Sequence, residues 1–144
     1  MVILDRLPTV DRLQHLGLTV EDRCLMCDNG HETRNHLFAD CPYGIQIWSA
    51  VLSLCGLERV MMDWERELVW LYTRLKGKSL IVFILKLAWN SYVYHIWEER
   101  NCRKFRNTYR DCSSLLGCIK DTVCIRVCSR RVHMDDVNRH ICAA

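Results

Sequence analysis

The sequence predicts an all-α chain with one irregular segment. Apolar residues recur at helical spacing through most of its 144 residues, and strand-type alternation is weak throughout. Residues 19–41 alone have no clear period. Half of the residues are apolar, so a buried core can form, and the charged fraction of 26% is that of an ordinary folded protein. The net charge of +3 permits contact with an acidic polymer without arguing for one.

One helix is expected on each side of the irregular segment. The first lies within residues 7–18 and ends at Gly17. The second begins at Pro42, because proline fits the first turn of a helix, and continues to Gly56. Between them, the pair Asn29-Gly30 favours a tight turn.

Three further helices follow. One covers Trp64 to Leu75, with an expected buried face of Leu68, Leu71, Tyr72 and Leu75. The next helix covers about Leu80 to Phe105, and Ser79 can cap its start. The last helix runs from about Ser113 to Val127. The 80–105 helix carries a stripe at i, i+3, i+4, i+7 spacing: Leu85, Ala88, Trp89, Tyr92, Val93, Ile96 and Trp97. These aromatic residues could stack on bases, but this spacing is more typical of a core.

No targeting or membrane-spanning segment is expected. Asp5 and Arg6 interrupt the N-terminus before a signal-peptide core could form. The most apolar run, residues 80–85, is far shorter than the roughly 20 residues of a membrane span. We therefore expect an intracellular protein, in the nucleus rather than the cytoplasm, whose ten cysteines are reduced.

Four residues of the irregular segment have the spacing of a metal site, Cys24-x2-Cys27-x8-His36-x4-Cys41. Two cysteines separated by two residues can place both sulfurs on one ion, and the turn at Asn29-Gly30 can bring the histidine back. Three thiolates and one imidazole fill a tetrahedron, which favours a structural Zn²⁺ ion over a catalytic one. His31 is a competing fourth ligand. Because residues 19–41, here called the knuckle, hold few large apolar groups, we expect zinc to order them.

Longer motifs around these residues resemble the reverse-transcriptase zinc-binding domain of plant LINE-type (non-LTR) retrotransposon polyproteins. The first set is Asp11-Arg12-Leu13-x3-Gly17-Leu18, Cys24-x2-Cys27, Glu32-Thr33-x2-His36-Leu37-Phe38-x2-Cys41-Pro42 and Ile47-Trp48. The second is similar to the tail of those proteins: Lys76-Gly77-Lys78-Ser79 and Trp89-x2-Tyr92-x-Tyr94-x-Ile96-Trp97-x-Glu99-Arg100-Asn101-x-Arg103-x-Phe105. The resemblance implies a zinc-dependent appendage that contacts RNA or DNA beside a polymerase. It also implies a fragment or a derived gene product, since no polymerase palm or endonuclease is recognisable.

Basic residues near the knuckle and at the end of the 80–105 helix are the candidates for phosphate contacts. They are Arg23, Arg34, Arg100, Arg103 and Lys104. Arg100 and Arg103 belong to a basic run with Arg106 and Arg110, and such a run is commonly only a solvated face. Phe38 could stack on a base, although packing beneath the zinc is the better interpretation.

We expect a zinc-binding domain at residues 1–56 and a helical region at 57–144 packed on it. The alternative function is a helical protein-interaction or structural module that associates with itself through its aromatic helix, or a retroelement remnant without selected function. No enzyme is expected, because nothing orients a Cys–His pair and the setting of Cys24 and Cys27 is not thioredoxin-like. A second metal site is conceivable among Cys124, Cys128, His133, His140 and Cys142, although thiols on a helix are more often small apolar groups.

Overall fold

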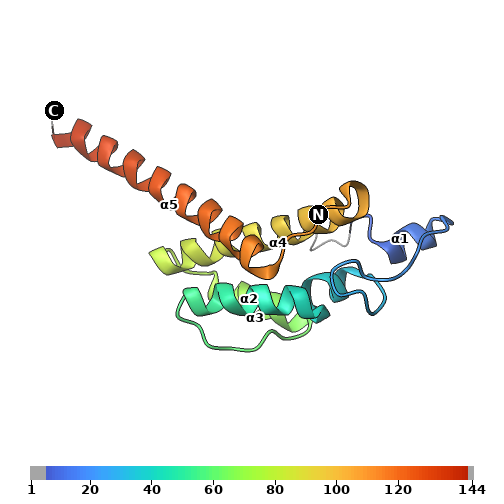
Figure 1. The fold of residues 1–144 in the computed structure, drawn as a ribbon. Coiled ribbons are helices and arrows are strands. Elements are labelled where there is room, and N and C mark those ends of the chain that lie inside the picture. Colours follow the sequence, from blue (N-terminus) through green and yellow to red (C-terminus); the bar gives the residue numbers. More distant parts are fainter. Residues whose placement is uncertain (1–5, 143–144) are drawn as a thin grey trace.

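The computed structural model describes residues 6–142, and the side chains of residues 6–130. The elements, in order, are α1 (Val10–His15), the π-helical turn η1 (His36–Asp40), α2 (Pro42–Leu54), α3 (Trp64–Arg74), α4 (Leu80–Arg106) and α5 (Cys112–Cys142). In Figure 1, α2, α3 and α4 form the body, and α5 packs across it before extending away. The described residues contain no strand. The predicted all-α class, with a knuckle followed by helices, is confirmed.

The helix ends follow local signals. Gly17 and Gly56 come just after α1 and α2 with φ values of +82° and +73°, which favour glycine. The Ser79 hydroxyl accepts a hydrogen bond from the Val82 amide at 3.4 Å and caps α4. The end of α5 was predicted wrongly, because the helix continues to Cys142. No glycine or proline follows Gly117 to stop it.

The core is an aromatic cluster built on α4. Trp89 and Tyr92 each lie 5.1 Å from Trp48 of α2, measured between ring centroids. The Tyr92 hydroxyl donates a 2.9 Å hydrogen bond to the carbonyl of Phe38, which itself contacts Trp64. The stripe on α4 therefore packs in or against the core, as its spacing predicts: its members are buried except Val93 and Trp97, which are partly buried at its edge. Phe38 is fully buried.

The buried face of α3 differs from the prediction. Tyr72 is 71% exposed, whereas Trp64, Glu67 and Leu71 point inward. The Glu67 carboxylate can be buried because the Trp48 indole, the Arg59 guanidinium and the Met62 amide all donate to it. Residues 64, 67 and 71 share one face of the helix, and Tyr72 lies about 100° away from Leu71.

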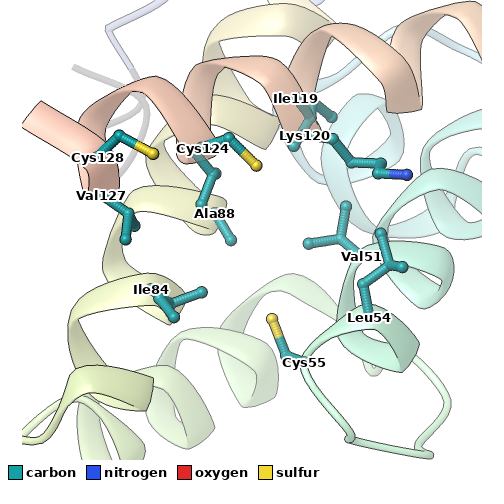
Figure 2. A pocket seen from close by; sticks show the side chains of 11 residues that line it. Val51, Leu54, Cys55, Ile84, Ala88, Ile119, Lys120, Cys124, Val127 and Cys128 are labelled. Atoms are coloured by element: carbon teal, nitrogen blue, oxygen red, sulfur yellow. The ribbon is translucent and has the colours of Figure 1, made fainter.

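A groove of about 320 Å³ opens between α2, α4 and α5 (Figure 2). Its walls are almost entirely apolar, with Val51 and Leu54 from α2, Ile84 from α4 and Val127 from α5. Among the described residues, α4 is long and apolar enough to cross a membrane by length and composition, a test that core helices also pass. Its contacts with α2, α5 and η1 identify it as the core helix.

Close approach of α2 to its neighbours depends on Gly44. A Cβ atom there would lie 2.9 Å from the Tyr92 hydroxyl oxygen and 3.0 Å from the Leu37 carbonyl oxygen. We predict that Gly44→Ala lowers the free energy of unfolding in urea by about 2 kcal/mol, because a buried hydroxyl and a backbone must move. Gly117→Ala on α5 is the control: nothing lies within 4 Å, so better helix propensity should raise stability by up to about 1 kcal/mol. An equal increase in the free energy of unfolding in Gly44→Ala and Gly117→Ala would contradict the close contact at Gly44.

Candidate metal centre

The first part of the knuckle folds as a tight hairpin. Arg23 and His31 form an antiparallel bridge, and the Cys24 amide donates to the Gly30 carbonyl at 3.0 Å. Asp28 and Gly30 have φ values of +56° and +76°, which reverse the chain. The predicted turn is confirmed, and it carries Cys24 and Cys27 on its inner side.

The second part of the knuckle is the π-turn η1, which the sequence did not reveal. The Cys41 amide donates to the His36 carbonyl at 2.6 Å, an i→i+5 bond. On an α-helix, residues five apart point about 140° away from each other, whereas this wider turn brings them to the same side. The Thr33 hydroxyl accepts from the His36 amide at 3.0 Å and fixes where the turn begins.

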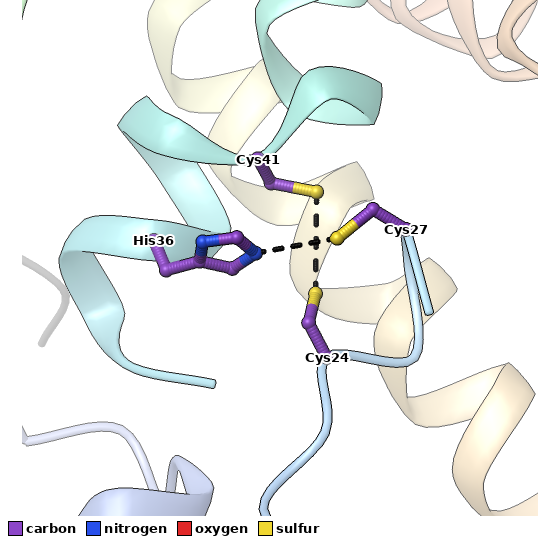
Figure 3. A group of neighbouring side chains, drawn as sticks. All are labelled: Cys24, Cys27, His36 and Cys41. Atoms are coloured by element: carbon purple, nitrogen blue, oxygen red, sulfur yellow. Dashed lines mark hydrogen bonds between the residues drawn. The ribbon is translucent and has the colours of Figure 1, made fainter. Parts of the chain in front are cut away.

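The side chains of Cys24, Cys27, His36 and Cys41 converge (Figure 3), and their ligating atoms all lie within 4.8 Å of one another. Zinc bonds of about 2.3 Å to sulfur and 2.0–2.1 Å to nitrogen, at tetrahedral angles, require edges of about 3.8 Å for S···S and about 3.5 Å for S···N. The Cys24 and Cys41 sulfurs are 3.9 Å apart, and the Cys27 sulfur is 3.4 Å from His36 Nε2. The cluster thus has the donor types of a zinc tetrahedron, and these two of its six edges have the matching lengths.

The structure does not bring His31 to this cluster. Its side chain is 45% exposed, and its Nδ1 lies 3.1 Å from the Asp22 carboxylate. The hairpin turns His31 outward, whereas η1 turns His36 inward.

Cys24 is the thiol most readily ionised in the cluster. The hydrogen bond with Cys41 is the main cause that lowers the pKa of Cys24 to about 5, while the same contact raises the pKa of Cys41. Burial raises the pKa of Cys27. Thiolate is the form that binds metal, so the cluster already favours one of the three charges it would need.

A buried ion pair fastens the knuckle to α4. Glu32 is fully buried, and the Arg100 guanidinium donates to both its oxygens, at 2.6 to 3.1 Å. The Val10 amide at the start of α1 also donates to the Glu32 carboxylate, at 3.1 Å. Glu32 therefore joins α1, the knuckle and α4 at one point.

Arg103 makes the second attachment. Its guanidinium donates to the carbonyls of Leu25 and Met26, which lie between the two knuckle cysteines, at 3.0 and 3.1 Å. Buried Glu99 accepts from Arg103 at 2.8 Å and from both the amide and the guanidinium of Arg110, also at 2.8 Å. We call Arg100 and Arg103, with Glu32 and Glu99, the arginine clamp.

The clamp corrects the prediction that Arg100 and Arg103 contact phosphate. Both guanidinium groups are committed to carboxylates and carbonyls, with side-chain exposures of 2% and 9%. Arg34 is mostly covered, stacks on Trp64 and pairs with Glu65. Of the five candidates, Arg23 is the most exposed, at 54% of its side chain, and Lys104 is partly exposed.

The C-terminal cysteines form no metal cluster among the described side chains. Cys124 and Cys128 are exposed on α5 and line the apolar groove, with Cys55 on the opposite wall (Figure 2). His133, His140 and Cys142, the other members of the conceivable second site, lie outside the described side chains.

The clamp predicts a pH dependence of stability. Burial alone would raise the pKa of Glu99, but the bonds from Arg110 and Arg103 outweigh it and lower that pKa below its ordinary value. Ionised Glu99 therefore stabilises the fold above the unfolded pKa of about 4.3, and this contribution is lost as pH falls through the folded pKa.

We predict that Glu99→Gln lowers the free energy of unfolding at pH 7 by about 3 kcal/mol, because buried arginine charges lose their partner. The gap to wild type should stay nearly constant from pH 7 to about pH 5, and narrow as urea unfolding is repeated below the unfolded pKa of about 4.3 toward the lowered folded pKa. Glu65→Gln, at a 74% exposed position, should change little at any pH. If the loss of unfolding free energy in Glu99→Gln were the same at every pH, the result would contradict an ionised Glu99 paired with the arginines.

Gly30 tests the geometry of the cluster itself. A Cβ atom there would lie 3.0 Å from His36 Cε1, in addition to the cost of φ +76°. Gly17 has a similar φ with nothing within 4 Å. We predict that Gly30→Ala and Gly17→Ala each lose about 1 kcal/mol of stability, but that only Gly30→Ala weakens zinc binding, by about tenfold, in competition with a chromophoric chelator. Equal zinc affinities would mean that the His36 ring is not held in place by Gly30.

Comparison with known proteins agrees with this geometry. No curated protein and no solved structure matches the chain. Residues 1–48 match the family described as zinc-binding in reverse transcriptase, and this match contains the hairpin, η1 and all four residues of the cluster. The N-terminal third of the chain is therefore a reverse-transcriptase zinc-binding domain.

Proposed function

We propose that the protein is a non-catalytic zinc module in which Cys24, Cys27, His36 and Cys41 hold one structural Zn²⁺ ion. The observation that carries the proposal is the agreement of two edges of the cluster, 3.9 and 3.4 Å, with those of a zinc tetrahedron. Four protein donors leave no place for water or substrate, which favours a structural role. In this role the ion stabilises the knuckle, which has few large apolar side chains of its own.

The first experiment is metal analysis. We expect one zinc ion per chain in the wild type and in His31→Ala, and loss of stoichiometric zinc in Cys24→Ser and His36→Ala. Removing zinc with a chelator should expose the amides of residues 19–41 to hydrogen exchange, because zinc binding worth on the order of 10 kcal/mol orders such segments. Native-like protection of these amides in a zinc-free sample would contradict the proposal.

We further propose that the module contacts RNA or DNA and derives from a plant LINE-type retrotransposon, which would place it in the nucleus. A cleft of about 240 Å³ beside the knuckle supports the contact, since it brings Arg23 of the hairpin and Lys104 of α4 to one surface. Glu21 also lines this cleft and lies 3.4 Å from Arg23, so a phosphate would compete with a weak, exposed ion pair. The contact would be electrostatic and independent of base sequence.

The salt dependence of binding tests this proposal. We expect the affinity for single-stranded RNA, measured by fluorescence anisotropy, to fall with salt. The double variant Arg23→Ala, Lys104→Ala should reduce the slope of log affinity against log salt by about 1.4, at roughly 0.7 for each lost phosphate contact. Arg66→Ala, at a 77% exposed arginine of α3, is the matched control and should leave the slope unchanged. Binding that is flat with salt would contradict a phosphate contact.

The second candidate function is a protein-interaction module. The apolar groove between α2, α4 and α5 favours it, because exposed apolar surfaces of this kind commonly receive a partner or a second copy. A stable dimer in size-exclusion chromatography, together with no affinity for nucleic acid, would favour this function over the first.

A further inference from the structure

Helix α4 carries aromatic residues on two opposite sides. Trp89, Tyr92 and Ile96 face the core, as described above. Tyr94, Trp97, Asn101 and Phe105 lie on the other side at i, i+3, i+7 and i+11, so they form one row along the helix. We call this row the outer aromatic face.

The outer aromatic face is open to solvent. Tyr94 is 61% exposed and Phe105 is 72% exposed, which is unusual for two large rings on one helix face. A groove of about 350 Å³ runs between them, with Trp97 and Asn101 in its wall and exposed Arg106 at its end. The rings are therefore separated by polar groups, unlike those of an apolar docking surface.

Accessible positive charge lies beside the Phe105 ring. The Lys104 ammonium lies 5.9 Å from the centroid of that ring, whereas the Arg100 guanidinium, 4.9 Å from the Trp97 centroid, is buried and neutralised by Glu32. Arg106 lies in the same last turn of α4. The acidic group in the groove, Glu98, is already paired with Arg110 at 3.2 Å and with His95 at 3.4 Å. The local charge therefore complements a polyanion.

We propose that the outer aromatic face binds a single-stranded nucleic acid by stacking its two exposed rings, Tyr94 and Phe105, against unpaired bases. Lys104 and Arg106 would hold the phosphates. Base stacking on aromatic rings beside cations is how proteins bind single strands without reading sequence. The inference rests on the proposed nucleic-acid contact and deepens it, because it names the form of the nucleic acid and the surface that binds its bases.

The geometry also gives the length of the bound strand. Eleven residues of helix separate Tyr94 from Phe105, a rise of about 16 Å. At about 3.4 Å for each stacked base, this corresponds to roughly five nucleotides. Lys104 lines the cleft beside the knuckle and its ammonium lies 5.9 Å from the Phe105 ring centroid, so a longer strand can continue from this face to the cleft.

The test measures binding of the full, zinc-loaded chain to fluorescein-labelled oligouridylate by anisotropy, over a series of salt concentrations. We expect Tyr94→Ala and Phe105→Ala each to weaken binding about tenfold at every salt concentration, without changing the salt slope. Tyr94→Phe should retain the wild-type affinity, because it keeps the ring. Affinity should rise up to about five nucleotides and less steeply beyond.

Tyr72→Ala on α3 is the matched control, since that ring is 71% exposed and also has a cation nearby, Lys76 at 4.6 Å. Unchanged binding in Tyr94→Ala and Phe105→Ala, or equal loss in Tyr72→Ala, would overturn the stacking face while leaving the phosphate contact intact. A wild type without affinity for RNA or DNA would overturn the nucleic-acid function itself. Loss of self-association in Tyr94→Ala without an effect on RNA would instead assign the face to a protein partner, and would also overturn the inference.

Discussion

The buried pair of Glu32 and Arg100 is the interaction on which the arrangement of this fold depends. Both side chains are almost fully excluded from solvent, and 68 residues separate them in the sequence. Removing either partner would leave an uncompensated charge inside the protein, which typically costs about 3–5 kcal/mol. Such a pair tolerates little displacement, because its strength depends on two-point hydrogen bonding. It therefore fixes the register of α4 against the knuckle.

The knuckle is held by polar bonds in addition to apolar packing. Arg103 bonds the carbonyls of the hairpin, and Glu32 accepts from the amide at the start of α1. The knuckle residues in the core are Cys24, Met26, Leu37, Phe38, Ala39 and Cys41. A metal in the four-residue cluster would add a further fixed point, between the hairpin and η1. The two sets of bonds act on the same hairpin, so order in the knuckle depends on α4 as well as on its own donors. The division at residue 56 stays a prediction, and the arginine clamp crosses it.

Local features of the sequence predicted local structure well. Helix ends at Gly17 and Gly56, the cap at Ser79 and the convergence of the cysteines all follow from short spacings. Arg100 and Arg103 were misassigned because their partners lie far away in the chain. One signal was present: the core stripe of α4 continues at helical spacing from Ile96 to Arg100 and Arg103, which places them on the buried side. The π-turn left no signal, because a single i→i+5 bond creates no apolar period.

The composition of α4 becomes intelligible once all its sides are considered. One side of α4 carries the aromatic core, and the last turns of the helix carry the arginines of the clamp. Ile84 and Ala88 line the apolar groove, and Tyr94 and Phe105 are exposed to solvent. A helix that is apolar on several sides resembles a membrane span by composition alone. Here, however, Glu99 and Arg100 are buried on the same side as Ile96, and each is matched by an opposite charge within the protein. The apolar character of α4 therefore reflects separate surfaces, and the exposed rings of Tyr94 and Phe105 lie outside the core cluster.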